Sequence, residues 1–444
     1  MRGLYGLILF VLFSGCSSVS LREVSYEYYQ GDPNKAFDLS LKGTKNKADA
    51  LLFEMMGGMI GFDLSLPQSF ALLERAEEQI NINEKQGMLT DLLEGIGAIA
   101  VNESIIPYKG YLYEGVMVNY YKALFLMKEG DLANARVEFN RANDRQRRLK
   151  AYYQTQIQKA IQLQDKNPQQ FSFSEERVLR DYQNLKKIEA FQGYINPVVS
   201  YLSGLFFMLE RDPKGIDLLK EAYGISRISL IQEDFLMAQR GMKGEKYTWV
   251  VIEDGMSARK IQKSFVIPVV TYDGIFDIAF ALPDWTKGNE IERSYHLWLS
   301  QSVSQAQRIG NLDPLIFNEF SKHLPFLLTR AITSSTLRAL SQYWIQKTTS
   351  GLTKMLFAMG GMAYDIATTQ ADLRSNQILP HSFWVARLKN QKGILKLQGD
   401  LGVYFELKMG EECVSEAELC LNKNNIIYFR NAGKNSFYQI ILRH

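Results

Sequence analysis

The chemistry-bearing residues of this 444-residue chain do not form a recognised catalytic or metal-binding motif. The sequence contains no G-x4-G-K-[ST] phosphate loop, no H-E-x-x-H pair and no G-x-S-x-G turn. Its four histidines are widely separated, at His296, His323, His381 and His444. We therefore predict no catalytic residue, no metal site and no bound cofactor, and we expect a protein that is not an enzyme.

Arginines at helical spacing form the main charged pattern. Arg141, Arg145 and Arg148 are four and three residues apart, which places them on one face of a helix. A row of guanidinium groups could bind an anionic partner, such as a carboxylate-rich protein surface or lipid headgroups. The alternative is that Glu138, Asp144 and acidic groups on neighbouring helices neutralise the row.

A second charged pair, Asp372 and Arg374, lies between a Gly-rich stretch and the turn Leu379-Pro380. The two side chains could form an ion pair that fixes this junction, or they could present a polar contact to a partner. We favour the structural role, because a connection between two elements commonly needs such a brace.

Cys413 and Cys420 are seven residues apart and could close a hairpin in an oxidising compartment. We predict a structural disulfide; two free thiols are the alternative. A redox role is disfavoured because thioredoxin-like centres use the shorter C-x-x-C spacing.

The first sixteen residues predict export and lipid attachment. Arg2 precedes a short apolar run, Leu4 to Phe13, which is too short to span a membrane and is typical of a secretory signal. The run ends in Phe-Ser-Gly-Cys16, which resembles the lipobox of bacterial lipoproteins. That resemblance implies a signal peptide over 1–15, a covalent lipid on Cys16 and a tether over 16–23. Ser17 resembles the outer-membrane sorting signal, so we expect a lipid-anchored protein of the outer membrane that faces the periplasm.

The segment from 24 to 240 is predicted to be helical throughout, because its apolar residues recur every three or four positions. Ala135, Phe139 and Ala142 follow the turn Gly130-Asp131 with the small–large–small spacing of a tetratricopeptide (TPR) helix. Similar triplets recur at Ser69, Leu73 and Ala76 and at Gly215, Leu219 and Ala222. The predicted domain is an irregular TPR-like array; an unrelated helical domain is the alternative.

The period changes after the linker 241–246. Strands are predicted at 247–253, 264–271 and 275–282, followed by helices from about 290 to 349 and over 355–369. Further strands are predicted from about 383 to the last residue, 444. The predicted fold class is α+β, with a helical domain at 24–240 and an α+β domain at 247–444.

Composition excludes two classes of protein. The chain is 46% hydrophobic and 22% charged, which are ordinary values for folded proteins and exclude wholesale disorder. Lys and Arg number 51 against 48 Asp and Glu, so the formal charge is only +3. A general nucleic-acid binder concentrates far more positive charge, and we expect no nucleic-acid partner.

Two stretches resemble a family of proteobacterial lipoproteins. The first runs from Val118 to Arg148, and the second contains Ala367–Ser375 with Leu379-Pro380 and Val385–Leu388. The resemblance implies the same order of helical half, strands, helices and final β segment. Family members tend to be encoded near lipoproteins that regulate cell-wall synthases, which implies a role in envelope assembly; no enzymatic activity transfers.

These patterns together predict a lipid-anchored periplasmic scaffold that binds envelope proteins through its helical repeats. Stacked helical repeats form concave surfaces suited to peptides and helices. The alternatives are an enzyme acting on cell-wall glycan and a structural component of a secretion or motility machine.

Overall fold

The computed structural model describes residues 19–86, 106–148, 195–324 and 370–444, except 243, 272–273, 412, 414 and 416, together with 327–328, 331–332 and 335. The predicted signal peptide, Cys16 and the predicted helix over 355–369 lie outside the described residues. Lipid attachment therefore stays a prediction.

Helices form the first half, as the periodicity predicts. They are α2 (Leu21–Tyr29), α3 (Pro33–Gly43), α4 (Ala50–Asp63), α5 (Gln68–Gln86), α7 (Leu112–Lys128), a helix over 132–148, α11 (Pro197–Leu209), α12 (Lys214–Ser226) and α13 (Ser229–Arg240). Polar residues start several of them. The Asp32 carboxylate accepts from the Asn34 amide at 2.9 Å, and Pro33 occupies the first position of α3.

Consecutive helices pair as hairpins because small residues let their backbones approach. A Cβ added at Gly58 of α4 would lie 2.6 Å from the Leu73 side chain of α5. One added at Gly215 of α12 would lie 2.5 Å from the Met208 amide nitrogen of α11. The three small–large–small triplets predicted from the sequence are all buried. These glycines therefore serve close helix packing.

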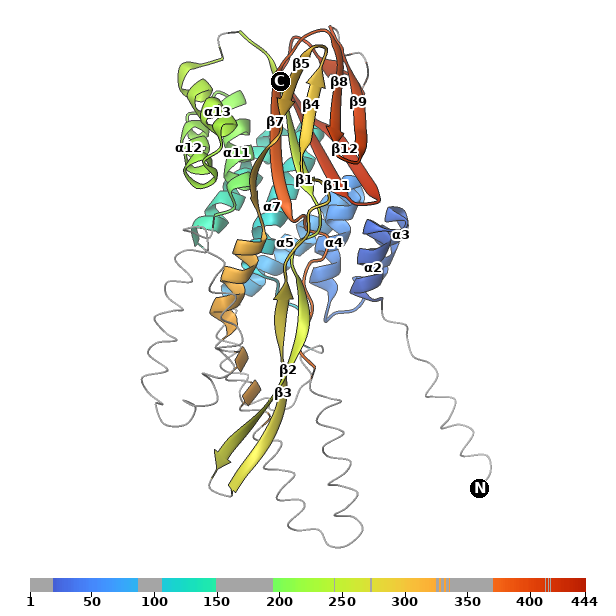
Figure 1. The fold of residues 1–444 in the computed structure, drawn as a ribbon, viewed down its shortest axis with the longest axis vertical. Coiled ribbons are helices and arrows are strands. Elements are labelled where there is room, and N and C mark those ends of the chain that lie inside the picture. Colours follow the sequence, from blue (N-terminus) through green and yellow to red (C-terminus); the bar gives the residue numbers. More distant parts are fainter. Residues whose placement is uncertain are drawn as a thin grey trace, which may run out of the picture.

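The described part of the second half contains twelve strands. They are β1 (Tyr247–Asp254), β2 (Arg259–Thr271), β3 (Gly274–Thr286), β4 (Tyr295–Leu299), β5 (Ser302–Gln305), β6 (Gln307–Asn311), β7 (Ser382–Lys389), β8 (Gly393–Gly399), β9 (Gly402–Gly410), β10 (Leu419–Cys420), β11 (Asn425–Ala432) and β12 (Asn435–Arg443). One sheet has the order β12-β11-β1-β7-β6 and a second the order β10-β9-β8-β4-β5. Strands β2 and β3 form a separate hairpin that runs away from the two sheets (Figure 1).

The described chain forms three layers: the second sheet, the first sheet, and the helices (Figure 1). Alternation along β1 shows the arrangement. Val250 and Ile252 belong to the core between the sheets, whereas Trp249 and Val251 belong to the core between the first sheet and the helices. The core between the first sheet and the helices includes residues from Val24 to Leu442, so the helical and α+β halves share it.

The first sheet packs against the inner helices, which we define as α4, α7 and α11. All thirteen residues of α11 are buried, and the Phe62 ring at the end of α4 lies 5.1 Å from the Tyr428 ring of β11. Helix α7 contacts the same sheet through the Tyr121 hydroxyl, which donates to Glu253 of β1. The first sheet thus covers the faces of these three helices that turn toward it.

The helical prediction for 290–349 is wrong over its first third. Residues 295–311 form β4, β5 and β6, and helix starts only at 313. Tyr295, Leu297 and Leu299 are buried in alternation with His296 and Trp298, which is the pattern of a half-buried strand. Strand β4 pairs with the adjacent β5 in a local hairpin and, on its other edge, with β8 about 100 residues later.

Candidate functional site

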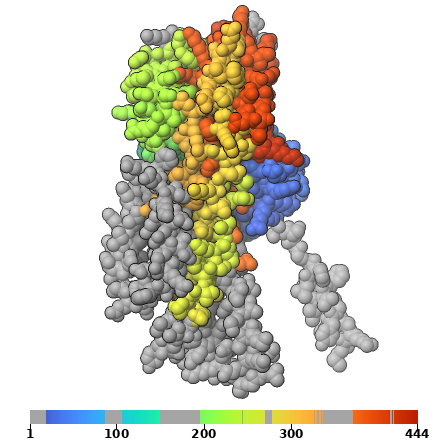
Figure 2. All heavy atoms as spheres, viewed as in Figure 1, coloured from blue at the N-terminus to red at the C-terminus, as the bar shows by residue number. Residues whose placement is uncertain are grey.

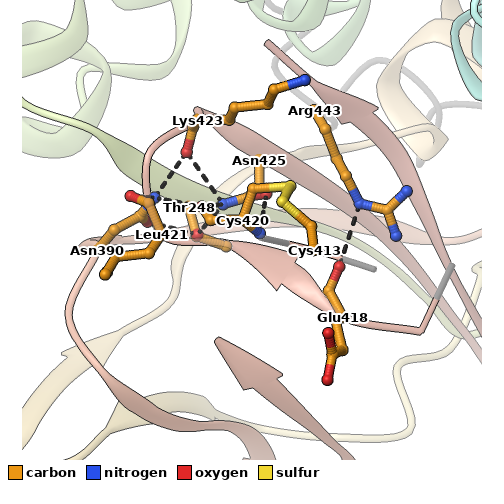
Figure 3. Close-up of a disulfide and its surroundings, with 9 residues drawn as sticks. All are labelled: Thr248, Asn390, Cys413, Glu418, Cys420, Leu421, Lys423, Asn425 and Arg443. Carbon is orange, nitrogen blue, oxygen red and sulfur yellow. Dashed lines mark hydrogen bonds between the residues drawn. A yellow bond between two sulfur atoms is a disulfide. The ribbon is translucent and has the colours of Figure 1, made fainter. Parts of the chain in front are cut away.

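The predicted disulfide is present. Cys413 and Cys420 are bonded, with their Cα atoms 5.1 Å apart (Figure 3). The segment after Cys420 is held by two asparagine side chains. Asn425 accepts from the Cys420 amide and donates to its carbonyl, both at 3.0 Å, and Asn390 donates to the Lys423 carbonyl at 2.7 Å. The bond therefore fixes a turn at the end of the second sheet and has a structural role.

The arginine row has one buried member. Arg145 is only 2% exposed, and its guanidinium donates to Asn119 at 3.0 Å, to Asn81 at 2.9 Å and to Glu84. For Arg145, acidic and amide groups of neighbouring helices supply the partners, which is the alternative foreseen from the sequence. Arg145 is therefore closed to an external ligand in this structure.

Arg141 and Arg148 are 52% and 66% exposed. Arg141 lies 2.7 Å from a Glu138 oxygen, and Arg148 lies 3.7 Å from a Glu84 oxygen. Their acidic partners are buried or mostly buried, but both guanidinium groups themselves are more than half exposed, so both arginines remain accessible to an anion.

Sequence reasoning missed the centre of this network, Lys122 of α7. Its side chain is 2% exposed and its Nζ lies 2.5 Å from Glu77 and 3.0 Å from Glu138. Asn119 donates to the same two carboxylates at 2.8 and 2.7 Å. A lysine inside an otherwise apolar helix was the available signal, because such a charge needs a buried partner. The network ties α5, α7 and the 132–148 helix together.

Asp372 and Arg374 form the predicted ion pair, with two contacts of 2.8 and 2.9 Å. The Arg374 guanidinium also reaches the Asp49 carboxylate at 3.1 Å and the Ile106 carbonyl at 2.9 Å. It therefore braces the α3–α4 connection and the segment before α7 against the segment before β7. The geometry matches the structural role that we favoured.

A buried acid–tyrosine cluster lies where the first sheet meets the helices. We define it as Asp63, Glu253, Tyr28, Tyr121 and Tyr428, all buried. Tyr28 donates to Asp63 and Tyr121 to Glu253, each at 2.5 Å. The Tyr428 oxygen lies 2.9 Å from Asp63 and 3.2 Å from Glu253.

Burial raises both carboxyl pKa values in this cluster. Loss of hydration raises the pKa of Asp63 to about 6 and that of Glu253 to about 7, although the guanidinium of nearby Arg430 lowers both. Tyr428 has one hydroxyl hydrogen and touches both acids, so both contacts are hydrogen bonds only when one carboxyl carries a proton. The cluster therefore joins helices to sheet through a buried hydrogen-bond network.

The sequence carried a signal for the cluster that went unused. Glu253 and Asp254 end a β-branched strand, and alternation sends them to opposite faces. Asp254 lies between the sheets, where it accepts from the Tyr295 hydroxyl at 2.6 Å and the Ile291 amide at 2.9 Å. Burial raises the pKa of Asp254 as well. Two adjacent acids in an apolar strand indicate buried polar partners on both sides.

The histidines have separate structural settings. His381 Nδ1 lies 3.3 Å from Asp313, whose carboxylate also accepts from the Gly288 amide at 3.0 Å. His444 Nε2 lies 3.0 Å from Glu210. Burial and the nearby Lys260 lower the pKa of His323 to about 4. Across the described ranges, no three His, Cys, Asp or Glu side chains gather in a group that could hold a metal ion.

An open cleft of about 690 Å³ lies beside α11–α13, the green helices that adjoin the orange and red strands in Figure 2. We call it the methionine-lined cleft. Its walls come from the end of α11, the start of α12, the end of α13, the 241–246 linker and the ends of two sheet strands. Its lining residues are Met208, Leu209, Arg211, Asp212, Pro213, Ile216, Met237, Ala238, Gly241, Met242, Gly244, Glu245, Lys246, Asn424 and His444.

Comparisons with known proteins add no assignment. No protein-family model, no curated protein sequence and no solved structure matches this chain. Within the part of the chain that the structure describes, no helix is both long enough and apolar enough to cross a membrane.

Proposed function

We propose that the protein is a lipid-anchored adaptor of the bacterial cell envelope. A lipid on Cys16 would attach it to the outer membrane, and the body would face the periplasm and bind envelope proteins. The helix hairpins, interpreted as irregular TPR-like repeats, would form the framework of the adaptor. The lipobox-like sequence at Cys16 and the resemblance to envelope lipoproteins support this proposal.

The observation that carries the proposal is the contrast between enclosed and open sites. Burial raises the carboxyl pKa values of Glu253 and Asp63, and both groups are enclosed between helices and sheet and hold those elements together. The methionine-lined cleft is open and is lined by both apolar and charged residues. An enzyme needs its shifted groups within reach of a substrate, whereas an adaptor needs an accessible docking surface.

The inner helix faces are covered by the first sheet, so partner binding is assigned to the outside of the molecule. Exposed apolar side chains are found on three separate elements: Tyr26 on α2, Val137 on the 132–148 helix and Trp298 on β4. Together with Ile216 in the cleft, they provide one probe position on each of four elements.

The test is photo-cross-linking in living cells. A photoreactive amino acid would replace, one at a time, Tyr26, Val137, Ile216 or Trp298 in the full-length protein. We expect one or more positions to capture a discrete envelope protein. A Cys16→Ser variant is expected to leave the membrane fraction and to lose that product. Capture of no protein at any position, together with attached or processed cell-wall glycan, would overturn the proposal in favour of a glycan-acting enzyme.

A further inference from the structure

The methionine-lined cleft has an apolar lining, and its acidic residues have ion-pair partners whereas, in the part of the chain that the structure describes, two of its cationic residues do not. Three methionines, Met208, Met237 and Met242, line it together with Ile216 and Leu209. Methionine side chains are flexible and polarisable, and they suit surfaces that adapt to apolar side chains of different shapes.

The acidic groups of the cleft already have cationic partners. The Asp212 carboxylate is bonded to the Arg136 guanidinium and also accepts from the Lys214 amide at 2.9 Å. The Glu245 carboxylate lies 2.6 Å from the Lys389 ammonium. Both acids are therefore neutralised within the protein.

Two cationic residues of the lining have no acidic partner among the described residues. Arg211 and Lys246 form no ion pair with any residue in the described ranges, although both line the cleft. The cleft therefore combines an apolar lining with two cations that have no acidic partner in the described ranges. This combination favours an amphipathic ligand whose anionic groups can pair with Arg211 and Lys246.

The backbone at Arg211 makes a clean test of this residue possible. Its φ is 58°, in the left-handed region that follows the end of α11, where glycine is the usual residue. An arginine here strains the backbone, so glycine can replace it without loss of stability. Arg227, at the end of α12, has the same conformation, with a φ of 59°, but does not line the cleft. The chain thus contains a matched control.

The lining favours a peptide over a small molecule. Pockets for small molecules are mostly enclosed and rich in aromatic side chains. This cleft is open and has no aromatic residue in its lining, and six of its fifteen lining residues are charged or polar: Arg211, Asp212, Glu245, Lys246, Asn424 and His444. A peptide can place apolar side chains on the floor while its acidic groups reach the rim.

We propose that the methionine-lined cleft binds an acidic peptide segment of a partner protein, with one or two apolar side chains on the methionine floor and carboxylates paired with Arg211 and Lys246. This inference rests on the proposed adaptor function and specifies its docking site.

The test uses fluorescein-labelled eight-residue peptides and the purified full-length protein. One panel carries two Leu or Phe residues among Asp and Glu, and the matched panel replaces the acids by Lys. Fluorescence anisotropy is expected to show binding by acidic peptides, weakening as NaCl is raised, and no binding by the basic panel. Arg211→Gly should weaken binding about 5–10-fold, a typical loss for an interface arginine, and Lys246→Gln should act in the same direction.

The control is Arg227→Gly. It relieves the same backbone conformation outside the cleft, so it should leave peptide affinity unchanged. Arg211→Gly should keep or raise the Tm, because glycine suits a positive φ, and its binding loss then cannot be ascribed to unfolding. A further variant, Met237→Glu, places a negative charge on the floor and should abolish binding by the acidic panel.

Three results would overturn the inference. Acidic and basic peptides could bind equally, Arg211→Gly and Arg227→Gly could have the same affinity, or a long-chain fatty acid such as myristate could fill the cleft while no peptide does. Partner capture by cross-linking from Tyr26, Val137 or Trp298 would then still support the adaptor function. The two proposals therefore fail separately.

Discussion

Replacing Glu253 by Gln is expected to stabilise the protein at neutral and alkaline pH, although the residue is buried and hydrogen-bonded. The carboxyl has an ordinary pKa of 4.5, and burial raises it to about 7 in the folded chain. The folded state therefore binds a proton more tightly than the unfolded state does. Below pH 4.5 the group is protonated in both states, so its ionisation does not lower the free energy of unfolding.

The cost of ionising Glu253 appears as the pH rises. Between pH 4.5 and 7 the unfolded chain loses this proton while the folded chain keeps it, so the free energy of unfolding falls. A tenfold change in proton affinity is worth about 1.4 kcal/mol, so the full difference is about 3 kcal/mol above pH 7. Gln carries no charge, keeps an oxygen that accepts from Tyr121, and has an amide group that can donate to the Tyr428 oxygen. We expect Glu253→Gln to exceed the wild type by about 2–3 kcal/mol at pH 8 and to match it near pH 4.

The assay is urea unfolding, followed by circular dichroism and tryptophan fluorescence at unit steps from pH 4 to pH 8. The matched control is Glu411→Gln, an exposed acid whose pKa is lowered by its hydrogen bond to Lys392. Its pH dependence should have the opposite sign, with any stabilisation lost as the pH falls. A Glu253→Gln variant that is less stable than the wild type at pH 8, or that differs from it equally at every pH, would refute the reasoning.

Three other substitutions test the packing and the cross-links. Lys122→Met removes the buried ammonium between Glu77 and Glu138 and leaves these glutamates with only their arginine contacts, which should cost about 3 kcal/mol of unfolding free energy in urea titrations; an unchanged midpoint would contradict the buried network. Cys413→Ser should cost about 2–3 kcal/mol, and wild-type protein with reductant should fall to the same stability, since both lose the short Cys413–Cys420 loop. Gly215→Ala adds a methyl 2.5 Å from the Met208 nitrogen and should lower the unfolding free energy by about 1–3 kcal/mol in chemical denaturation, whereas Gly224→Ala, with open space around it, should not.

Local patterns predicted most elements of the fold. Apolar residues at helical spacing located the helices of the first half, and β-branched runs located β1 and β7–β9 to within one or two residues. The small–large–small triplets predicted close helix packing, which Gly58 and Gly215 show. The cysteine spacing predicted the disulfide. Each of these features depends on neighbours within about ten residues.

The failures involve partners far away in the chain. Strand β4 forms a short hairpin with β5, but it is held in the second sheet by β8, about 100 residues later. The arginine spacing indicated one helix face, but contacts with α5 and α7 buried Arg145 and left Arg148 exposed.

Sequence patterns alone predicted the helical character of the first half, most of the strands, the cysteine pair and the side chains that share a face. These properties follow from backbone propensities and from periods of 3.6 and 2. The tertiary structure alone decided that the first sheet covers the inner helices, that Asp63 and Glu253 share a buried tyrosine, and that the 241–246 linker forms one wall of a cleft. Those contacts join segments up to hundreds of residues apart, and burial at such junctions sets the pKa values and the accessibility of each charge.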